Sequence, residues 1–383
     1  MCVPEVRYCR PCRSVRLILP ILAVILSILF EPHTHSSHWH MMTTLGLAII
    51  GAGGENIATS SHLPALRHIP EARLVALHDV TAEGVRRSAE QYGAEPYTDL
   101  AAMLARDDVD VVIVASPDRF HAEHVVQVAA AGKHILCQKP LAMSLDEARR
   151  MIAAVTTAGV RFGAAQSMRY EAAARAARAL IEQGAIGRPV YAACSVKGRF
   201  YSYPPNSPYR RKESGGQFLH NGPHYVDLLC YLLEDLPVRV YGQSRAHYPT
   251  DDRLETDNYT VCLLDFAGGG MGRVEQNLTM LSPPGFPQRQ ETRIMGTEGN
   301  LVFGPGREPA LEVFDTGGFS VAQPQTIPPQ EEPFVLLQRE FFRAILDGAD
   351  PLIPAAWSFR VLEACLGALE SCATGEAVEL GQL

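Results

Sequence analysis

The sequence predicts an α/β fold in two parts: a mostly parallel sheet with helices between its strands, then an α+β part with a mainly antiparallel sheet. Strand-like apolar runs alternate with helical patterns from Leu45 to Ala165, as in repeated βαβ units. After Gln166 the period changes, and strand-like runs separated by turn-rich stretches follow. The length of 383 residues also favours two domains, or one domain with a large extension.

The composition is that of an ordinary globular protein. Hydrophobic residues make up 47% and charged residues 20%, which excludes a mainly disordered, collagen-like or multi-span membrane protein. Lys and Arg number 34 against 42 Asp and Glu, for a formal charge of −8. A mildly acidic chain lacks the basic surface that nucleic acid binding requires, so we expect no nucleic acid partner.

The first 42 residues differ from the rest of the chain. Leu17 to Phe30 is almost wholly apolar and follows a head with four arginines, but a membrane span needs about 20 apolar residues. Three interpretations stay open: an export or anchor signal, an extension upstream of a true start at Met41 or Met42, and a buried element of the fold. We expect a cytoplasmic protein, or an exported one if residues 1–42 are a genuine signal, without further membrane contact.

Nine cysteines, an odd number, are scattered along the chain and do not resemble a disulfide framework. The head contains ligand types that zinc prefers, at Cys9, Cys12, His33, His35, His38 and His40. The apolar segment separates these cysteines from the histidines, and no tight ligand spacing joins them. We therefore expect no metal site, and we expect the six later cysteines to be buried small hydrophobes in a reducing compartment.

A glycine-rich turn follows the first strand-like run. Leu45–Ile50 is typical of a strand buried on both faces, and Gly51, Gly53 and Gly54 follow at once, before a helical pattern from about Asn56 to Arg67. Gly51 permits a tight turn, Gly53 lets the backbone approach a pyrophosphate, and the helix N-terminus offers N–H groups to phosphates. The layout predicts a dinucleotide site with Asn56 in place of a third glycine.

An acidic residue ends the second strand-like run, Arg73–Leu77, which is followed by His78 and Asp79. Asp79 would accept hydrogen bonds from the adenine ribose hydroxyls and would repel a 2′-phosphate, so NAD is the favoured cofactor. Arg86 and Arg87 follow a few residues later and leave NADP open as the alternative.

Three further strand-like runs continue the alternation, at Val109–Ala115, His134–Cys137 and Val160–Ala165. Ser116 and Pro117 follow the first of them, and Gln138 and Lys139 follow the second. Doubly wound sheets bind ligands at these carboxyl ends. Ser144 and Glu147 then form a capping box that opens another helix.

The second part contains six strand-like runs: Val190–Val196, Val238–Gln243, Tyr259–Phe266, Gly272–Thr279, Thr292–Met295 and Leu301–Phe303. Helical patterns are at Tyr170–Gln183, Phe334–Leu346 and Trp357–Thr374. We therefore expect an N-terminal extension at 1–42, a nucleotide-binding domain at 43–166 and a substrate-binding α+β domain at 167–383.

Two histidines lie in a stretch that leads into an apolar helix. His220, His224 and Asp227 are spaced to share one helical face, and Pro223 predicts that the helix begins near His224. Such a histidine can exchange a proton at neutral pH, or can simply pack at a helix start. Upstream, the stretch that contains Arg210 binds a polar substrate or is a solvated loop.

Together these segments resemble the Gfo/Idh/MocA family of oxidoreductases, from Leu45 almost to the end of the chain. Gly51–Gly54 looks like the family's dinucleotide turn, Ala115–His121 resembles its next cofactor segment, and Ala131–Ala142 is similar to its Glu-Lys-Pro signature. The helix entry matches at Gly215, Gly216, Gly222, His224 and Asp227, and the late strand turn at Met295–Gly299.

The resemblance implies a nicotinamide-binding Rossmann domain and an open-faced α/β domain that often oligomerises through its sheet, here as a homodimer or homotetramer. It implies oxidation or reduction of sugars and polyols, with Lys139 polarising the substrate oxygen and His224 exchanging the proton. Implied cofactor contacts are Gly51, Gly53, Gly54, Asn56, Asp79, Ser116, Pro117, His121, Gln138 and Lys139. Implied substrate contacts are His220, Asn221, Arg169 and Arg210.

Two departures from the family pattern stand out. Gln138 replaces the usual Glu beside Lys139, and His220 stands where many members carry Asp. Either His220 contacts the substrate directly, or the proton relay is altered. The same fold also serves enzymes that recycle tightly held NAD to cleave or isomerise sugars, and non-catalytic regulators that sense nucleotides, so both remain alternatives.

Overall fold

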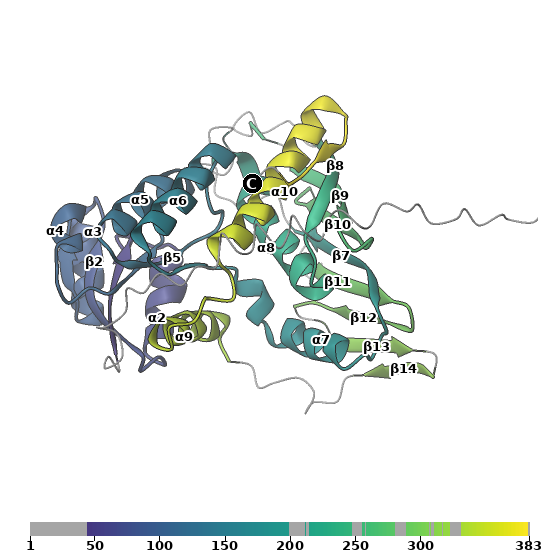
Figure 1. Cartoon of the computed structure of the whole chain (residues 1–383), viewed down its shortest axis with the longest axis horizontal. Helices are drawn as coiled ribbons and strands as arrows, with labels where there is room; N and C mark the ends of the chain where they lie inside the picture. Colours follow the sequence, from purple (N-terminus) through teal and green to yellow (C-terminus); the bar gives the residue numbers. More distant parts are fainter. Residues whose placement is uncertain are drawn as a thin grey trace, which may run out of the picture. The chain divides into compact units, whose positions relative to one another are not determined.

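The computed structural model describes residues 44–198, 211, 214–246, 255–256, 258–279, 289–305, 307, 310–315, 317–321 and 331–381. They form two sheets and the helices around them (Figure 1). The expectations for residues 1–42, including the zinc-like cluster, and for Arg210 lie outside the described residues. Within the described part, no helix has both the length and the apolar character that crossing a membrane requires.

The first sheet has six strands in the order β3-β2-β1-β4-β5-β6, all paired in parallel. Its strands are β1 (Leu45–Ile50), β2 (Ala72–His78), β3 (Glu95–Tyr97), β4 (Val111–Val114), β5 (His134–Cys137) and β6 (Phe162–Ala164). Every residue of β1, β4, β5 and β6 is buried, as the apolar runs predicted for strands covered on both faces. The strand order reverses direction between β1 and β4, where doubly wound sheets bind ligands.

Helices connect the parallel strands. They are the π-helical turn η2 (Ala58–His62), α2 (Leu63–Leu66), α3 (Ala82–Tyr92), α4 (Leu100–Leu104), the 3₁₀ turn η3 (Asp118–Phe120), α5 (His121–Ala130) and α6 (Leu145–Ala158). A second 3₁₀ turn, η4 (Ser167–Tyr170), follows the last strand of this sheet. The predicted helix after the glycine turn is thus two short pieces, with Pro64 in the first turn of the second. A proline costs little at this position, because the backbone N–H that it lacks would have no hydrogen-bond partner within the helix.

The second sheet has nine strands in the order β14-β13-β12-β11-β7-β10-β9-β8-β15. They are β7 (Pro189–Lys197), β8 (Pro237–Arg245), β9 (Tyr259–Phe266), β10 (Met271–Asn277), β11 (Arg289–Gly296), β12 (Gly299–Phe303), β13 (Leu311–Asp315), β14 (Gly318–Val321) and β15 (Val378–Glu379). All neighbours are antiparallel except β7 and β10, so the predicted α+β class with a mainly antiparallel sheet is confirmed.

Helices cover one face of the second sheet, and none of the described helices covers the other, which we call the open face. The covering helices are α7 (Ala172–Glu182), α8 (Gly216–Leu233) and α10 (Ala355–Thr374), which contact the sheet (Figure 1). Burial alternates along β9 and β10, as expected when one face of a sheet meets the core. Helix α9 (Pro333–Leu346) instead packs against η2, α2 and η4, and thereby joins the late chain to helical segments of the first part.

The start of α8 corrects one prediction. The helix begins at Gly216 rather than near His224, and Pro223 lies inside it. Interior proline costs a helix about 3 kcal/mol, because one hydrogen bond is lost. Here the side chains on both sides of the proline are buried, including Phe218 and Leu219 before it. We attribute the longer helix to this tertiary packing, which the local sequence pattern does not reveal.

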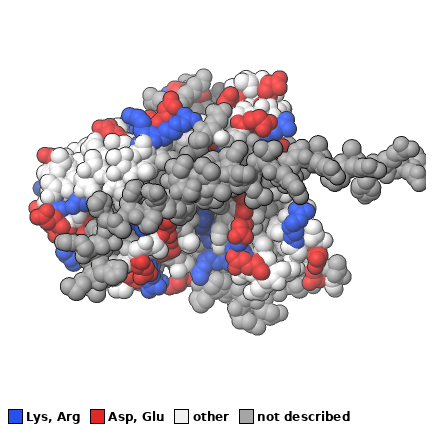
Figure 2. Space-filling model, viewed as in Figure 1, with Lys and Arg blue, Asp and Glu red and all other residues white. Residues whose placement is uncertain are grey.

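Six cysteines lie in the described residues, and all six are free thiols. Five are buried and Cys372 is half-buried, close to the prediction that they serve as small hydrophobes. Burial raises the pKa of Cys194 to about 12, so that thiol is a poor nucleophile. On the surface, basic and acidic side chains of the described residues lie interspersed in the view of Figure 2.

Candidate functional site

The glycine turn between β1 and η2 is tightly packed from two sides. Gly51 has a φ of +91°, and a Cβ there would lie 2.6 Å from the carbonyl oxygen of Ala115. A Cβ at Gly53 would lie 2.2 Å from Cγ of Asp79. Both positions therefore require glycine, whereas a Cβ at Gly54 would meet nothing within 4 Å. The open side at Gly54 leaves room for a ligand to approach the backbone.

Asp79 and Asn56 hold this turn in shape. The carboxylate of Asp79 accepts hydrogen bonds from the backbone N–H of Gly53 and of Thr81, both at 2.9 Å. Each carboxylate oxygen has a second lone pair, so the predicted ribose contact stays compatible with this geometry. The Asn56 amide donates to the Gly51 carbonyl at 2.8 Å and accepts from the N–H of Ala58 at 2.9 Å. Asn56 thus caps the helical segment where a third glycine is usual.

Ser116, Pro117 and His121 lie at the carboxyl end of β4. The buried ring of His121 bonds the carbonyl oxygen of Ser116 at 2.9 Å and that of Pro140 at 2.8 Å. It therefore ties the segment after β4 to the segment after β5. The Ser116 hydroxyl is bonded to His124 at 2.8 Å.

Gln138 is buried at the end of β5. Its Oε1 accepts from the backbone N–H of Lys139 at 3.3 Å, which fixes the orientation of the amide. Its Nε2 then donates to Nε2 of His62 at 2.7 Å. Burial lowers the pKa of His62 to about 3, so this ring is neutral and can accept. Gln338 of α9 donates to the His62 carbonyl at 3.3 Å, so the amide that replaces the usual Glu belongs to a buried polar network.

Lys139 reaches from the same strand end to α8. Its Nζ lies 2.9 Å from the carbonyl oxygen of His220 and 3.2 Å from Nε2 of that residue. Burial lowers the pKa of Lys139 to about 8, against the opposite effect of the Asp118 carboxylate. An amine with such a pKa exists in both protonation states near neutral pH, as groups that take part in proton chemistry require.

His220 is bonded on its other side to a carboxylate. Its Nδ1 lies 2.9 Å from Oδ2 of Asp118. Asp118 is the first residue of η3, which follows β4. Burial alone would raise the pKa of Asp118, but the hydrogen bond and charge of His220, with His121 and Lys139, lower it overall. Asp118 was not among the site residues predicted from the sequence. Its position directly after Ser116 and Pro117, at a ligand-binding strand end, was the available signal.

His224 lies one helical turn beyond His220 on α8, and Asn221 lies between them, half-buried. Burial lowers the pKa of His224 well below its ordinary value, and the charges of Lys139 and His220 lower it further. Among the described residues its Nδ1 has no hydrogen-bond partner. The structure therefore brings Lys139, His220 and His224 together and leaves a neutral imidazole with an unused nitrogen beside the lysine.

Two family models match the chain. Residues 45–166 match the model described as an oxidoreductase family with an NAD-binding Rossmann fold, and residues 174–302 match the GFO/IDH/MocA C-terminal domain. The chain belongs to the Gfo/Idh/MocA family. The predicted family, its Rossmann fold and its oxidoreductase class are thereby confirmed.

Curated relatives of this family include enzymes that act on sugars and polyols. The 1,5-anhydro-D-fructose reductase of Ensifer adhaerens is 34% identical over 255 residues, which are 65% of this chain and 73% of that protein. The scyllo-inositol 2-dehydrogenase (NAD(+)) of Bacillus subtilis is 28% identical over 352 residues, 90% of this chain and 97% of that protein.

Solved structures of the family share the fold of this chain. A levoglucosan dehydrogenase in complex with NADH and L-sorbose is 26% identical, with a TM-score of 0.78 over 89% of this chain and 100% of that one. An oxidoreductase domain protein from Kribbella flavida has the same identity, TM-score and coverage.

Arg169, a predicted substrate contact, is buried within the Gfo/Idh/MocA fold. Its guanidinium pairs in bidentate fashion with the Asp227 carboxylate, which also accepts from Nε1 of Trp357 at 2.8 Å. The guanidinium lies over the rings of Tyr231 and Trp357, 5.0 and 5.2 Å from their centroids. This arrangement joins η4 to α8 and α10, so Arg169 positions the helix that carries the histidines, and its contact with substrate stays a prediction.

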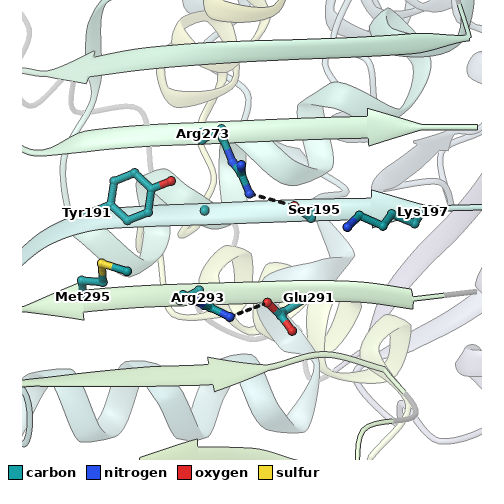
Figure 3. Close-up of a pocket in the computed structure, with 8 residues that line it drawn as sticks. Tyr191, Ser195, Lys197, Arg273, Glu291, Arg293 and Met295 are labelled. Carbon is teal, nitrogen blue, oxygen red and sulfur yellow. Dashed lines mark hydrogen bonds and ion pairs between the residues drawn. The ribbon is translucent and has the colours of Figure 1, made fainter. Parts of the chain in front are cut away.

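A separate hollow lies on the open face of the second sheet (Figure 3). It is lined by Tyr191, Ala193, Ser195, Lys197, Arg273, Glu291, Arg293 and Met295. Ser195 donates to Glu275 at 2.9 Å, and Arg293 donates to Glu291 at 3.0 Å. Opposite charges are thus paired within β10, where Arg273 lies 3.8 Å from Glu275, and within β11. These two strands flank β7.

Proposed function

We propose that this protein transfers a hydride between a nicotinamide cofactor and a hydroxyl or carbonyl group of a sugar, polyol or related compound. The observation that carries the proposal is the meeting of Lys139 with α8, where Nδ1 of His224 has no hydrogen-bond partner among the described residues. The named activities of the relatives support the substrate class.

In this proposal Lys139 donates a hydrogen bond to the substrate oxygen and stabilises negative charge that develops there. His224 is neutral, because its burial and the nearby charge of Lys139 disfavour its protonation, so an unprotonated ring nitrogen is available to accept the hydroxyl proton. Bound nicotinamide supplies the hydride chemistry. The protein orients the groups and controls the proton.

The residues around the glycine turn fit a dinucleotide. Gly51 and Gly53 allow the close turn, Gly54 leaves the backbone accessible, and Asn56 shapes the start of the helical segment. Asp79 favours NAD, since its carboxylate would repel a 2′-phosphate. Ser116, Pro117, His121, Gln138 and Lys139 complete the proposed set at the adjacent strand ends.

NADP remains the alternative cofactor. Arg86 lies 3.9 Å from Glu90, and Arg87 lies 3.1 Å from Glu83, all on α3. These pairs are largely exposed, so they bind the arginines only weakly and do not prevent contact with a phosphate.

We also propose that the chain forms a homodimer or homotetramer through the open face of the second sheet. The face carries paired charges of both signs, including Arg273 and Glu275 as well as Arg293 and Glu291. A twofold axis sets each patch against a copy of itself, so a patch with both signs can be self-complementary. Light scattering on the purified protein tests this assembly.

A substrate panel tests the proposed reaction. Polyols, sugars and sugar acids are offered to the full chain with NAD or NADP, and nicotinamide absorbance is followed. We expect turnover with at least one compound, and Lys139→Ala to lower kcat about 100-fold or more. Lys133→Ala is the matched control, because Lys133 lies at the opposite end of β5 and bonds the Arg106 carbonyl.

The panel also separates the alternatives. Sugar conversion without added cofactor would indicate an enzyme that recycles tightly held NAD. Nucleotide binding without turnover of any compound would favour a regulator over an oxidoreductase. Full activity of Lys139→Ala would refute the assigned role of the lysine.

A further inference from the structure

Three polar groups form a continuous chain where the first sheet meets α8. Oδ2 of Asp118 lies 2.9 Å from Nδ1 of His220, and Nε2 of His220 lies 3.2 Å from Nζ of Lys139. The side chains of Asp118 and His220 are only 10% and 16% exposed. The three residues come from different segments, after β4, after β5 and within α8, so the fold alone brings them into line.

The hydrogen-bonding capacity of each group fixes the direction of the chain. An ionised carboxylate only accepts, so the proton of a neutral His220 ring lies on Nδ1 and Nε2 is the acceptor. Lys139 therefore donates to His220 Nε2 and, at 2.9 Å, to the His220 carbonyl. Two of its three N–H bonds are used in this way. Both ring nitrogens of His220 are also used, which leaves no ring nitrogen for a substrate.

We propose that Asp118 and His220 are positioning residues for Lys139, which keep its ammonium group protonated and aim its third N–H at the substrate oxygen. This inference rests on the proposed function. Of the two alternatives for His220, the inference favours an altered proton relay over direct contact with the substrate. The family resemblance implies a carboxylate four residues before His224, and here Asp118 supplies a carboxylate from the segment after β4.

The electrostatics of the surrounding groups agree with this assignment. The Asp118 carboxylate raises the pKa of Lys139 against the effect of burial, and it also raises that of His220. His121 lowers the pKa of both Asp118 and His220, and Lys139 and His220 lower that of His224. Loss of the negative charge at Asp118 should therefore favour the neutral amine of Lys139.

The kinetic test compares Asp118→Asn with Asp107→Asn in the full chain. Asp107 is an exposed carboxylate before β4, at the opposite end of that strand from Asp118. We expect Asp118→Asn to lower kcat about 10- to 100-fold with little change in KM, because Asp118 does not touch the substrate. The alkaline limb of kcat against pH should move about one unit lower. Values equal to those of Asp107→Asn would overturn the proposal.

A double-mutant cycle asks whether Asp118 acts through His220. In a His220→Leu background, Asp118→Asn should lower kcat by a smaller factor than in the wild type, since the hydrogen-bonded link is already broken and only the direct charge effect of Asp118 on Lys139 remains. Multiplicative effects of the two substitutions would contradict the proposed chain. Asp118→Glu keeps the charge and should retain the alkaline limb near its original pH, which separates loss of charge from loss of fold.

A measurement without substrate separates this inference from the proposed function. Reductive methylation with formaldehyde labels neutral amines, and peptide mass spectrometry reads the label on Lys139. At pH 7 we expect Asp118→Asn to speed this labelling about three- to tenfold, and Asp107→Asn to leave it unchanged. Faster labelling without turnover of any sugar by the wild type would sustain the pairing and refute the oxidoreductase function. Turnover with unchanged labelling would refute the pairing alone.

Discussion

The junction between the first sheet and α8 and the open face of the second sheet use the same charged residue types in different ways. At the junction, Arg169 and Asp227 are buried, and each carboxylate oxygen of the pair is hydrogen-bonded. On the open face, Arg293 and Glu291 form a pair that remains 47% and 36% exposed. Water screens the exposed pair but not the buried one. The buried pair therefore holds the elements of the junction in position, whereas the exposed pair affects only how well the sheet surface complements a partner surface.

The largest expected effect concerns the buried pair. Arg169→Met leaves the Asp227 carboxylate buried without its partner, and we expect the free energy of unfolding to fall by about 3–5 kcal/mol. Urea denaturation measures the change. The double variant Arg169→Met, Asp227→Leu should recover much of the loss, because no unpaired charge remains. If the free energy of unfolding of the single variant fell by less than about 1 kcal/mol, the pair would not be what stabilises the junction.

The next effect concerns the cofactor turn. Asp79→Asn removes the charge that would repel a 2′-phosphate and weakens the acceptor for the ribose hydroxyls. A hydrogen bond to a charged group contributes about 1.5–3 kcal/mol, so the preference for NAD over NADP should fall about 10- to 100-fold. The ratio of kcat/KM for the two cofactors is the measurement. An unchanged ratio would mean that Asp79 serves only to hold the Gly53 turn.

We expect the buried His62 to make the stability of the protein sensitive to acid. Folding lowers the pKa of His62 from 6.5 to about 3, so the unfolded chain binds the proton more readily and stability falls as pH drops below 6.5. Between pH 6.5 and 5 this histidine alone should cost about 2 kcal/mol. His62→Gln should remove that part of the pH dependence, and the exposed His68→Gln should not. Parallel stability curves for wild type and His62→Gln would contradict the assignment.

The smallest effect is expected on the open face. Arg293→Ala removes one member of an exposed pair, so the stability of the subunit should change by no more than about 0.5 kcal/mol. The same change should weaken self-association if this face joins two copies, and sedimentation velocity measures that weakening. A large loss of subunit stability would mean that the exposed pair stabilises the fold as the buried Arg169–Asp227 pair does, and would contradict the comparison.

Much of the first half could be predicted from local patterns. The strands predicted around Leu45–Ile50 and His134–Cys137 match the observed bounds, because strands buried on both faces are continuous apolar runs. The capping box after β5 is also present, since Ser144 accepts from the N–H of Glu147 at 3.2 Å. The Glu147 carboxylate accepts a hydrogen bond from the N–H of Met143 rather than from that of Ser144. The capping-box motif does not specify which of the two N–H groups is bound.

Other features were beyond sequence reasoning. Strands β3 and β13 and the edge strands β14 and β15 are short or have no distinctive pattern. The parallel pairing of β7 with β10 joins segments about 80 residues apart. The length of α8 depended on burial around Pro223. In each case non-local packing decided the outcome over local propensity.

The sequence by itself determined most of the alternating strands and helices of the first part, the glycine turn and the acid that follows it, and the presence of a lysine and two histidines. Those features depend on residues close together in the chain, where periodicity and backbone sterics act. Only the tertiary structure decided which of them meet. Asp118 and His220 are 102 residues apart, and Lys139 and His220 are 81 apart, so their hydrogen bonds exist because sheet order and helix packing bring separate strand ends against α8.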